Sequence, residues 1–353
     1  MRRILIAPLD WGLGHATRCI PIIRELQSQG CEVLLAGSGD SLELLRREFT
    51  HLRTFMLPGY RPRYAHGGSM VWTMALQLPH FSRVISAEHG AIARIIEKEK
   101  IELIISDNRY GCWSRKIPSV FITHQSNVLM PARFGWLGPV VRTLNERLIS
   151  RFQTCWIPDF PPDQSLSGDL IAFGNTDLML KKEYIGWLSR FELSNRTARK
   201  YDAIAVFSGP EPQRTLLEII VMEQLKKSKL AYRVVRGLPA LNAEPSDKRI
   251  VNFLASGILQ EELEAADLVI ARSGFSTVMD LHALGKKAVF IPTPGQTEQE
   301  YLAARLMQKG VAFSMRQAKF NLSTAIEESK KFTGFTPPPK NTLLREAVAR
   351  LLR

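Results

Sequence analysis

A turn with the sequence Arg-Ser-Gly is the stretch of the chain best suited to bind a phosphate. Ser273 and Gly274 follow a short apolar run at residues 268–271 and precede a helical pattern at residues 275–284, which Gly285 ends. The first backbone N–H groups of a helix lack partners within it and point outward, so they attract anions. Gly274 has no side chain, which lets a phosphate approach the backbone. The turn is therefore typical of a phosphate site.

A carboxylate and a second turn extend this pattern toward a nucleotide site. Asp280 follows within the same helical pattern, where it can accept hydrogen bonds from ribose hydroxyls. A second apolar run at residues 288–291 leads to another turn and to a helical pattern from about residue 297 to 309. Strand, helix, strand and helix in this order indicate a parallel sheet with both turns at one edge. Alternatively, Thr277 and Asp280 fit a capping box, in which Asp280 only holds a helix end.

These residues resemble the donor half of glycosyltransferase family 28. The resemblance is carried by Arg272, Ser273, Gly274, Thr277, Asp280, Gly285, Pro292, Gln299, Glu300 and Tyr301. It implies an α/β protein of the GT-B fold, with two Rossmann-like domains whose parallel sheets face each other across a cleft. It also implies that the Ser-Gly turn holds the donor diphosphate, that Asp280 binds the ribose and that residues 299–300 touch the sugar. The family usually has Glu in place of Asp280, and its lipid II-forming N-acetylglucosaminyltransferase has two glutamines at residues 299–300.

Two further loops of the second half complete the expected donor site. Ser208 and Gly209 follow an apolar run and lead into a helix, a second arrangement that suits a phosphate, with Arg214 close behind. Phe253 and Leu254 lie in a loop that reads the nucleobase in the family, although Phe253 can equally well pack in the core. The expected donor-binding residues are Gly14, Ser208, Gly209, Arg214, Phe253, Leu254, Arg272, Ser273, Gly274, Ser276, Thr277, Asp280, Gln296, Glu298, Gln299 and Glu300.

His15 is the candidate general base. It follows a Gly-Leu-Gly turn between a strand at residues 3–9 and a helix that runs to about residue 29. This opening is similar to the first glycine loop of the same family, which has more glycines there. An imidazole can take the proton of an acceptor hydroxyl that attacks the anomeric carbon of a sugar, and a helix N-terminus keeps it neutral. The alternative is an ordinary polar residue in a first helical turn.

An aspartate after another strand is the candidate partner of His15. Asp107 follows an apolar run at residues 101–106, and its carboxylate would orient the imidazole. The alternative is that Asp107 caps the next segment. His124, after a run at residues 119–123, is a second candidate for the acceptor side of the site.

Two stretches of the first half suit an acceptor. Residues 58–72 form a loop rich in glycine, arginine and aromatic residues, in which Arg61 and Arg63 could meet an anionic acceptor; a variable surface loop is the alternative. Residues 136–151 predict a helix with an apolar stripe and surrounding arginines. Such a helix can lie on an anionic bilayer, but packing of the stripe into the core is the commoner explanation.

Composition limits the class of protein. The chain has 353 residues, 45% of them hydrophobic, a formal charge of +13 and no run long enough to span a membrane. The charge favours an anionic substrate or an anionic membrane face, and no nucleic-acid-binding motif is visible. The four cysteines have no metal-ligand spacing, so we expect reduced thiols, no metal site and a cytoplasmic protein, with a peripheral location on the inner membrane face as a further expectation.

The resulting prediction is a two-domain transferase. We place an acceptor domain at residues 1–157, an interdomain crossing at 158–200, a donor domain at 201–335 and a helix that returns to the first domain at 336–353. The predicted function is an inverting, metal-independent glycosyltransferase that needs no cofactor, with a UDP-sugar as donor and a hydroxyl acceptor, lipid-linked or soluble. One alternative is a nucleotide-sugar hydrolase or 2-epimerase of the same fold. Another is a UDP-sugar-binding protein without activity.

Overall fold

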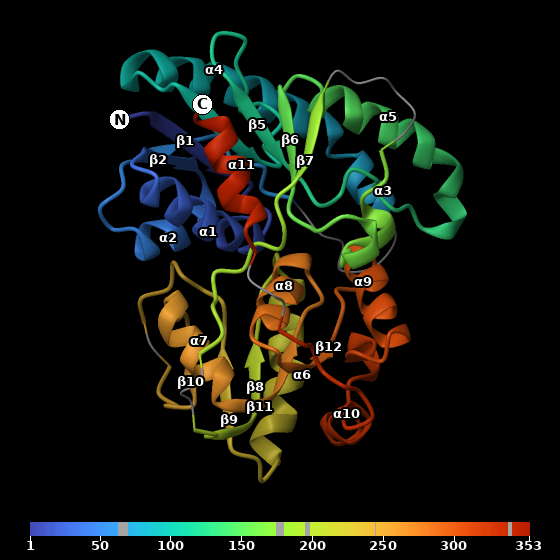
Figure 1. Cartoon of the computed structure of the whole chain (residues 1–353). Coiled ribbons are helices and arrows are strands. Elements are labelled where there is room, and N and C mark those ends of the chain that lie inside the picture. The colour runs from blue at the N-terminus through green and yellow to red at the C-terminus, as the bar shows by residue number, and fades with distance from the viewer. Residues whose placement is uncertain (63–69, 174–179, 195–197, 244, 338–340) are drawn as a thin grey trace.

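A computed structural model describes residues 1–62, 70–173, 180–194, 198–243, 245–337 and 341–353. The chain folds into two α/β domains, one above the other in Figure 1, and their facing sides meet in an interface. Short apolar strands alternate with amphipathic helices in both halves, and this alternation produces parallel sheets covered on both faces.

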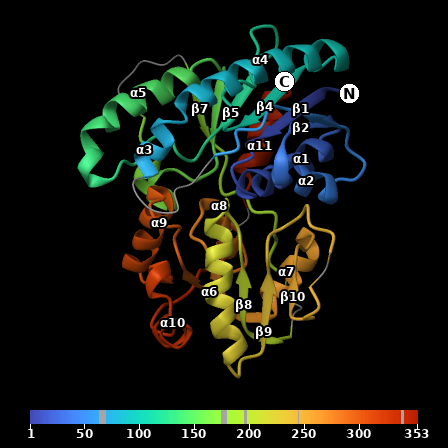
Figure 2. The ribbon, with the colours of Figure 1, turned by 180° about the vertical axis from the view of Figure 1, so that it is seen from behind.

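The first sheet has the strand order β3-β2-β1-β4-β5-β6-β7, and every neighbouring pair is parallel. Its strands are β1 (Arg3–Pro8), β2 (Glu32–Gly37), β3 (Thr54–Met56), β4 (Leu103–Asp107), β5 (Ser119–Ile122), β6 (Thr154–Ile157) and β7 (Lys181–Tyr184). Its helices are α1 (Gly14–Ser28), α2 (Gly39–Glu48), α3 (Met70–Ala75), α4 (Leu78–Glu99) and α5 (Gly138–Ile149), with 3-10 turns at Ala132–Leu137, Pro162–Gln164 and Gly168–Leu170. Seen from behind, α4 and α5 cover the outer face of this sheet (Figure 2).

The second sheet has the order β10-β9-β8-β11-β12-β13 and is also parallel throughout. Its strands are β8 (Tyr201–Val206), β9 (Tyr232–Val235), β10 (Ile250–Val251), β11 (Ala266–Ala271), β12 (Lys287–Phe290) and β13 (Phe313–Ser314). Its helices are α6 (Gln213–Lys227), α7 (Ser256–Glu264), α8 (Phe275–Ala283), α9 (Thr297–Gln308) and α10 (Leu322–Ser329), with a 3-10 turn at Gln317–Lys319. The strand–helix–strand–helix unit expected around the Ser-Gly turn is therefore present as β11, α8, β12 and α9.

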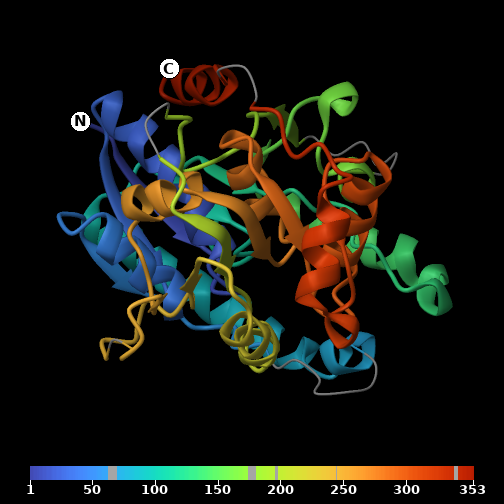
Figure 3. The ribbon, with the colours of Figure 1, turned by 90° about the horizontal axis from the view of Figure 1, so that it is seen from below.

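The domain division differs from the sequence prediction at the crossing. Residues 158–200 were expected to lie between the domains, but β7 pairs with β6 inside the first sheet. The connection to β8 therefore starts only after Tyr184. The last helix, α11 (Leu343–Leu351), packs Leu344, Ala347 and Val348 into the core around β1, β2 and α1. Viewed from below, α11 lies to one side of the second domain (Figure 3).

The predicted helix at residues 136–151 also differs in its packing. It is divided into the 3-10 turn Ala132–Leu137 and α5, and its predicted apolar stripe does not enter the core. Val140 is 55% exposed and Leu144 54%, while Asn145, Glu146 and Ile149 are buried on the opposite side. The explanation favoured from the sequence, that this stripe packs inside the protein, is thus wrong.

The two domains share part of their core. Phe275 and Met279 of α8 and Leu302 of α9 are buried in the same cluster as residues of β1, β2 and α1. These contacts hold the carboxyl edges of the two sheets against each other, which is where ligands bind in sheets of this type.

Candidate functional site

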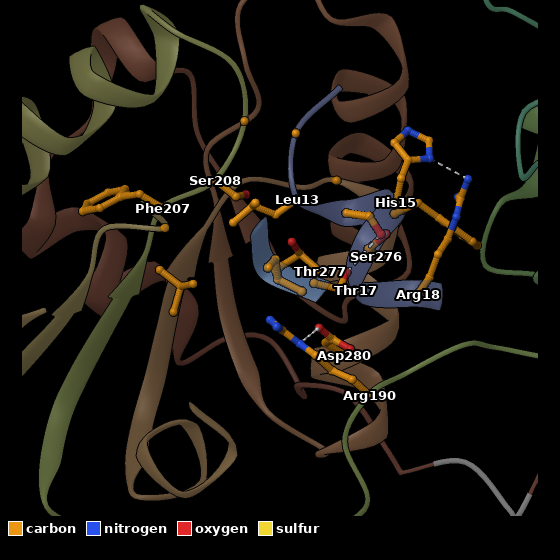
Figure 4. Close-up of a pocket in the computed structure, with 18 of the residues that line it drawn as sticks. Leu13, His15, Thr17, Arg18, Arg190, Phe207, Ser208, Ser276, Thr277 and Asp280 are labelled. Carbon is orange, nitrogen blue, oxygen red and sulfur yellow. Dashed lines mark hydrogen bonds and ion pairs between the residues drawn. The ribbon is translucent and has the colours of Figure 1, made fainter. Parts of the chain in front are cut away.

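A cleft lined by residues of both domains lies between the facing edges of the two sheets. It contains about 1180 Å³ of space, counting the part that is open to solvent. The first domain contributes the glycine loop and the first turn of α1, and the second contributes the loops after β8 and β11 and the start of α9 (Figure 4). Of the predicted site residues, the following line it: Gly14, His15, His124, Ser208, Gly209, Phe253, Leu254, Gly274, Ser276, Thr277, Asp280, Gln296, Glu298 and Gln299.

The structure brings His15 and Asp107 together. Nδ1 of His15 lies 2.8 Å from Oδ1 of Asp107, which has no exposed surface. The sheet explains this distance, since β1 and β4 are neighbours and Pro8 is in register with Asp107. The glycine loop follows β1 directly, so His15 emerges beside the end of β4. The carboxylate is therefore placed to orient the imidazole.

Arg18 is a third member of this group that the sequence analysis did not identify. It lies one turn after His15 on the same face of α1, and its side chain is only 1% exposed. Its Nε donates to Oδ2 of Asp107 at 2.5 Å, and its Nη2 donates to Oδ1. The i, i+3 spacing of His15 and Arg18 in a predicted helix was the available signal.

The neighbours of Asp107 decide its ionisation. Burial alone would raise the pKa of Asp107, but the charges of Arg18 and His15 and the hydrogen bonds from both hold it well below its usual range. Asp107 is therefore ionised at every physiological pH. For His15, burial lowers the pKa and Arg18 lowers it further, while Asp107 acts in the opposite direction; the net pKa lies below 6.5. The neutral imidazole is thus the stable form near pH 7.

The start of α8 offers the expected anion site. The helix begins after Gly274, which has no side chain to block or cap the backbone N–H groups. The hydroxyl of Ser276 donates across the cleft to the carbonyl oxygen of Gly14, at 2.8 Å. A Cβ atom on Gly14 would lie 2.9 Å from Oγ of Ser276, so any other residue here would force the Ser276 side chain to shift. The first turn of α8 and the residue before His15 are thus in direct contact.

Asp280 lines the cleft but is not free there. Its Oδ1 accepts a hydrogen bond from the hydroxyl of Ser189 at 2.8 Å, and its Oδ2 accepts one from Nε of Arg190 at 3.3 Å. Both partners belong to the crossing between the domains. Burial raises the pKa of Asp280, and Arg190 opposes that rise. The alternative of a capping box with Thr277 is wrong, because the N-cap of α8 is Gly274 and Thr277 lies inside the helix.

Glu298 reaches the same place from the start of α9. Its Oε1 accepts a hydrogen bond from the backbone N–H of Phe275 at 3.4 Å, in the first turn of α8. The same oxygen lies 3.1 Å from Nε2 of His124, within the distance of an ion pair. Burial would raise the pKa of Glu298, but His124 and His15 lower it, and the net pKa is lowered. A carboxylate therefore lies where the donor diphosphate was expected.

Two arginines of the predicted donor set form ion pairs and hydrogen bonds outside the cleft. Arg214 forms ion pairs with Glu211 and Glu218 and donates to the carbonyl oxygen of Arg236. Arg272 is buried, and its guanidinium donates to the carbonyl oxygens of Ile291, Pro292 and Gln213 at 3.0, 3.1 and 2.6 Å. Burial lowers the pKa of Arg272 to about 10. Neither side chain lines the cleft, which corrects the prediction for both.

Three other predicted residues do not line the cleft, and a fourth lies outside the described residues. The hydroxyl of Ser273 donates to the carbonyl oxygen of Gln299 and ties the two turns together. Glu300 is exposed and accepts from the backbone N–H of Gly295, so the sugar contact expected for residue 300 is not supported by its position. Arg61 is exposed and does not line the cleft, and Arg63 lies outside the described residues.

Metal-binding clusters and membrane-spanning helices are both absent from the described residues. Within them, no group of three or more His, Cys, Asp or Glu side chains has a metal-binding arrangement. In the same part of the chain, every helix is too short or too polar to cross a bilayer. All four cysteines are buried and unpaired with one another.

Known proteins of two kinds resemble this chain in sequence. It is 23% identical over 327 residues to a protein of Methanosarcina acetivorans named "Uncharacterized glycosyltransferase", covering 87% of this chain and 84% of that one. It is also 23% identical over 344 residues to the UDP-N-acetylglucosamine--N-acetylmuramyl-(pentapeptide) pyrophosphoryl-undecaprenol N-acetylglucosamine transferase of Haemophilus influenzae, covering 91% and 87%.

Solved structures share the fold at lower identity. The glycosyltransferase SnogD from Streptomyces nogalater matches with a TM-score of 0.60 at 16% identity, over 100% of this chain and 99% of that one. MurG of Acinetobacter baumannii matches with a TM-score of 0.54 at 14% identity, over 99% and 94%.

The two parallel-sheet domains, the cleft between them and these similarities define a glycosyltransferase of the GT-B fold. Among such enzymes, the chain resembles family 28: residues 238–341 match the model of the "Glycosyltransferase family 28 C-terminal domain". The resemblance inferred from the Ser-Gly turn is thereby confirmed, since that turn, α8 and α9 lie inside the matched region.

Proposed function

We propose that this enzyme transfers a sugar from a UDP-sugar to a hydroxyl acceptor, with inversion at the anomeric carbon and without a divalent metal. The observation that carries the proposal is the pair of His15 and the buried Asp107 beside the N-terminus of α8. The choice of a UDP-sugar is supported by the relative from Haemophilus influenzae, whose name specifies UDP-N-acetylglucosamine.

The reaction is a single displacement in this proposal. His15 takes the proton of the acceptor hydroxyl, the oxygen forms a bond to the anomeric carbon, and the bond from that carbon to the diphosphate breaks with its electron pair on the diphosphate. Asp107 stabilises the imidazolium that forms. The backbone N–H groups of α8 stabilise the charge on the leaving group, a role that a metal ion has in other enzymes. One displacement inverts the configuration of the carbon.

A panel of nucleotide sugars tests the proposal. We expect a UDP-sugar to bind and to stay intact without an acceptor. When the correct acceptor is present, the UDP-sugar should be consumed, and EDTA should not lower the rate of transfer. Hydrolysis or epimerisation without an acceptor would favour the alternative reactions of the same fold. Failure of every UDP-sugar to bind would contradict the proposed donor.

The pH dependence of turnover follows from the lowered pKa of His15. Its neutral form accepts the proton, and a lowered pKa keeps the ring neutral to a lower pH than free histidine, which titrates at 6.5. We therefore expect kcat/KM to stay level through neutral pH and to fall on the acid side only below pH 6.5. A pH–rate profile measures this, and an acid limb above pH 6.5 would contradict the assignment.

We further propose that the acceptor is lipid-linked and that the first domain meets an anionic bilayer through a patch at one end. Exposed apolar side chains of this patch are Leu76, Leu78, Trp136, Val140 and Leu144, and their exposed fractions are 81%, 62%, 74%, 55% and 54%. They belong to the segments around α3 and α5, which lie at the same end of the molecule in both side views (Figures 1 and 2). Arg133 and Arg147 are exposed beside them, which suits anionic head groups.

Replacing Leu144 by glutamate is expected to weaken binding to vesicles that contain phosphatidylglycerol by about tenfold, because an apolar contact is lost and a repelling charge is added. Co-sedimentation measures the change. Leu193→Glu is the matched control, since Leu193 is also 54% exposed but belongs to the crossing. Equal loss in both variants would contradict a specific membrane-binding patch.

A further inference from the structure

One buried guanidinium contacts three polar side chains of the site. Arg18 donates to both carboxylate oxygens of Asp107, its Nη2 lies 2.8 Å from Nδ1 of His15, and its Nη1 lies 2.5 Å from Nδ1 of His124. Burying a guanidinium is costly in free energy, and Asp107 alone would suffice as its counter-ion. The additional contacts with two histidines of the cleft indicate a role beyond that of an ion pair.

The hydrogen-bonding chemistry of Arg18 restricts the state of His124. A guanidinium can only donate, so Nδ1 of His124 has to accept, and in the neutral ring the hydrogen is on Nε2. That nitrogen lies 3.1 Å from Oε1 of Glu298, which comes from the second domain. The ring of His124 also stacks on Phe275, with centroids 4.6 Å apart and planes 2° from parallel. Phe275 is the first residue of α8.

Arg18 also restricts the state of His15. The ionised carboxylate of Asp107 can only accept, so Nδ1 of His15 carries the hydrogen and donates it to Oδ1 of Asp107, and the other ring nitrogen is then able to accept a proton. Nη2 of Arg18 lies 2.8 Å from the same Nδ1, and because both groups are donors this contact is not a hydrogen bond. Arg18 holds both oxygens of Asp107 and thereby fixes the direction of this hydrogen bond. Its charge is permanent, since a guanidinium does not deprotonate in proteins.

We propose that Arg18 is a positioning residue of the transfer reaction, which orients Asp107 toward His15 and holds His124 toward Glu298 of the donor domain. A continuous polar bridge then runs from the catalytic base, through Arg18 and His124, to the helix N-terminus at which we place the diphosphate. The contact of His124 with Glu298 is the part of the bridge that crosses from the first domain to the second. This inference rests on the proposed role of His15.

Two substitutions of Arg18 separate its charge from its geometry. Arg18→Met removes both, and we expect kcat to fall by about 10²-fold with little change in the KM of the donor, because the base is misplaced. The acid limb of the pH–rate profile is expected to move to higher pH, since a positive charge no longer opposes protonation of His15. Arg18→Lys keeps a charge but not the planar set of donors, so kcat should still fall while the acid limb stays near its wild-type position. Arg46→Met, an arginine of α2 outside the cleft, is the control that should behave as wild type.

Titration of His15 by NMR tests the inference without turnover. In Arg18→Met the resonances of His15 should titrate at higher pH than in the wild type, whether or not the correct donor and acceptor are known. Wild-type kcat and an unshifted titration in Arg18→Met would overturn the inference. If that variant does not fold, Arg18→Lys decides: wild-type kcat in the folded lysine variant would overturn it. Absence of any transfer by the wild-type enzyme would instead count against the proposed function.

Discussion

Replacing His15 by alanine is expected to lower kcat by about 10²- to 10⁴-fold, the usual contribution of a general base, while UDP still binds. The imidazole lies 2.8 Å from a buried carboxylate and lines the cleft, but the groups that we expect to bind the nucleotide belong to the second domain. Transfer assays measure the first effect, and isothermal titration with UDP measures the second.

The control for this prediction is His51→Ala. His51 is exposed between α2 and β3 and contacts Gln27, far from the cleft lining. The His51→Ala variant should therefore keep wild-type turnover. Unchanged turnover in His15→Ala would show that another group accepts the proton, and His124 would then be the next candidate.

Replacing Asp107 by asparagine is expected to reduce both turnover and stability. The change leaves the charge of Arg18 buried without a counter-ion, and breaking a buried pair in this way costs about 3–5 kcal/mol. It also leaves one acceptor oxygen where His15 and Arg18 now use two, so the imidazole is held less well. Urea unfolding measures the free energy of unfolding, and transfer assays measure the loss of turnover.

The stabilisation from the ion pair of Asp107 and Arg18 depends on pH. The pKa of Asp107 is lowered in the folded protein, so this stabilisation is present above the ordinary aspartate pKa and is lost only as the pH falls through the lowered value.

Asp163→Asn provides the matched control for the charge change. Asp163 is exposed in the 3-10 turn Pro162–Gln164, and its substitution should leave the free energy of unfolding within about 0.5 kcal/mol of wild type. A similarly small change in Asp107→Asn would contradict the view that the buried pair stabilises the fold.

The site could be predicted from the sequence where a side chain follows a strand. His15 and Asp107 both come directly after strands of one parallel sheet, and the ends of such strands meet at one edge. Arg18 was missed because its role depends on which residues face α1, and a helical position alone does not reveal its partners. The family resemblance located the turns at Ser273 and Gln299 but not the direction of each side chain.

Two errors concern arginines whose partners cannot be identified from the sequence pattern. Arg214 and Arg272 follow the right turns, yet nearby carboxylates or carbonyl oxygens bind their guanidinium groups away from the cleft. β7 was missed because its sequence, Lys-Lys-Glu-Tyr, has no apolar pattern. It is the edge strand of the sheet and needs little burial there.

The most direct test of the account is a crystal structure of the enzyme with UDP. We predict that the diphosphate lies within hydrogen-bond distance of the backbone N–H groups at the start of α8 and that Glu298 has moved away from the N–H of Phe275, because both anions need the same donor. The ribose should lie against Asp280. UDP bound elsewhere, or at the cleft without contact to α8, would contradict the placement of the donor.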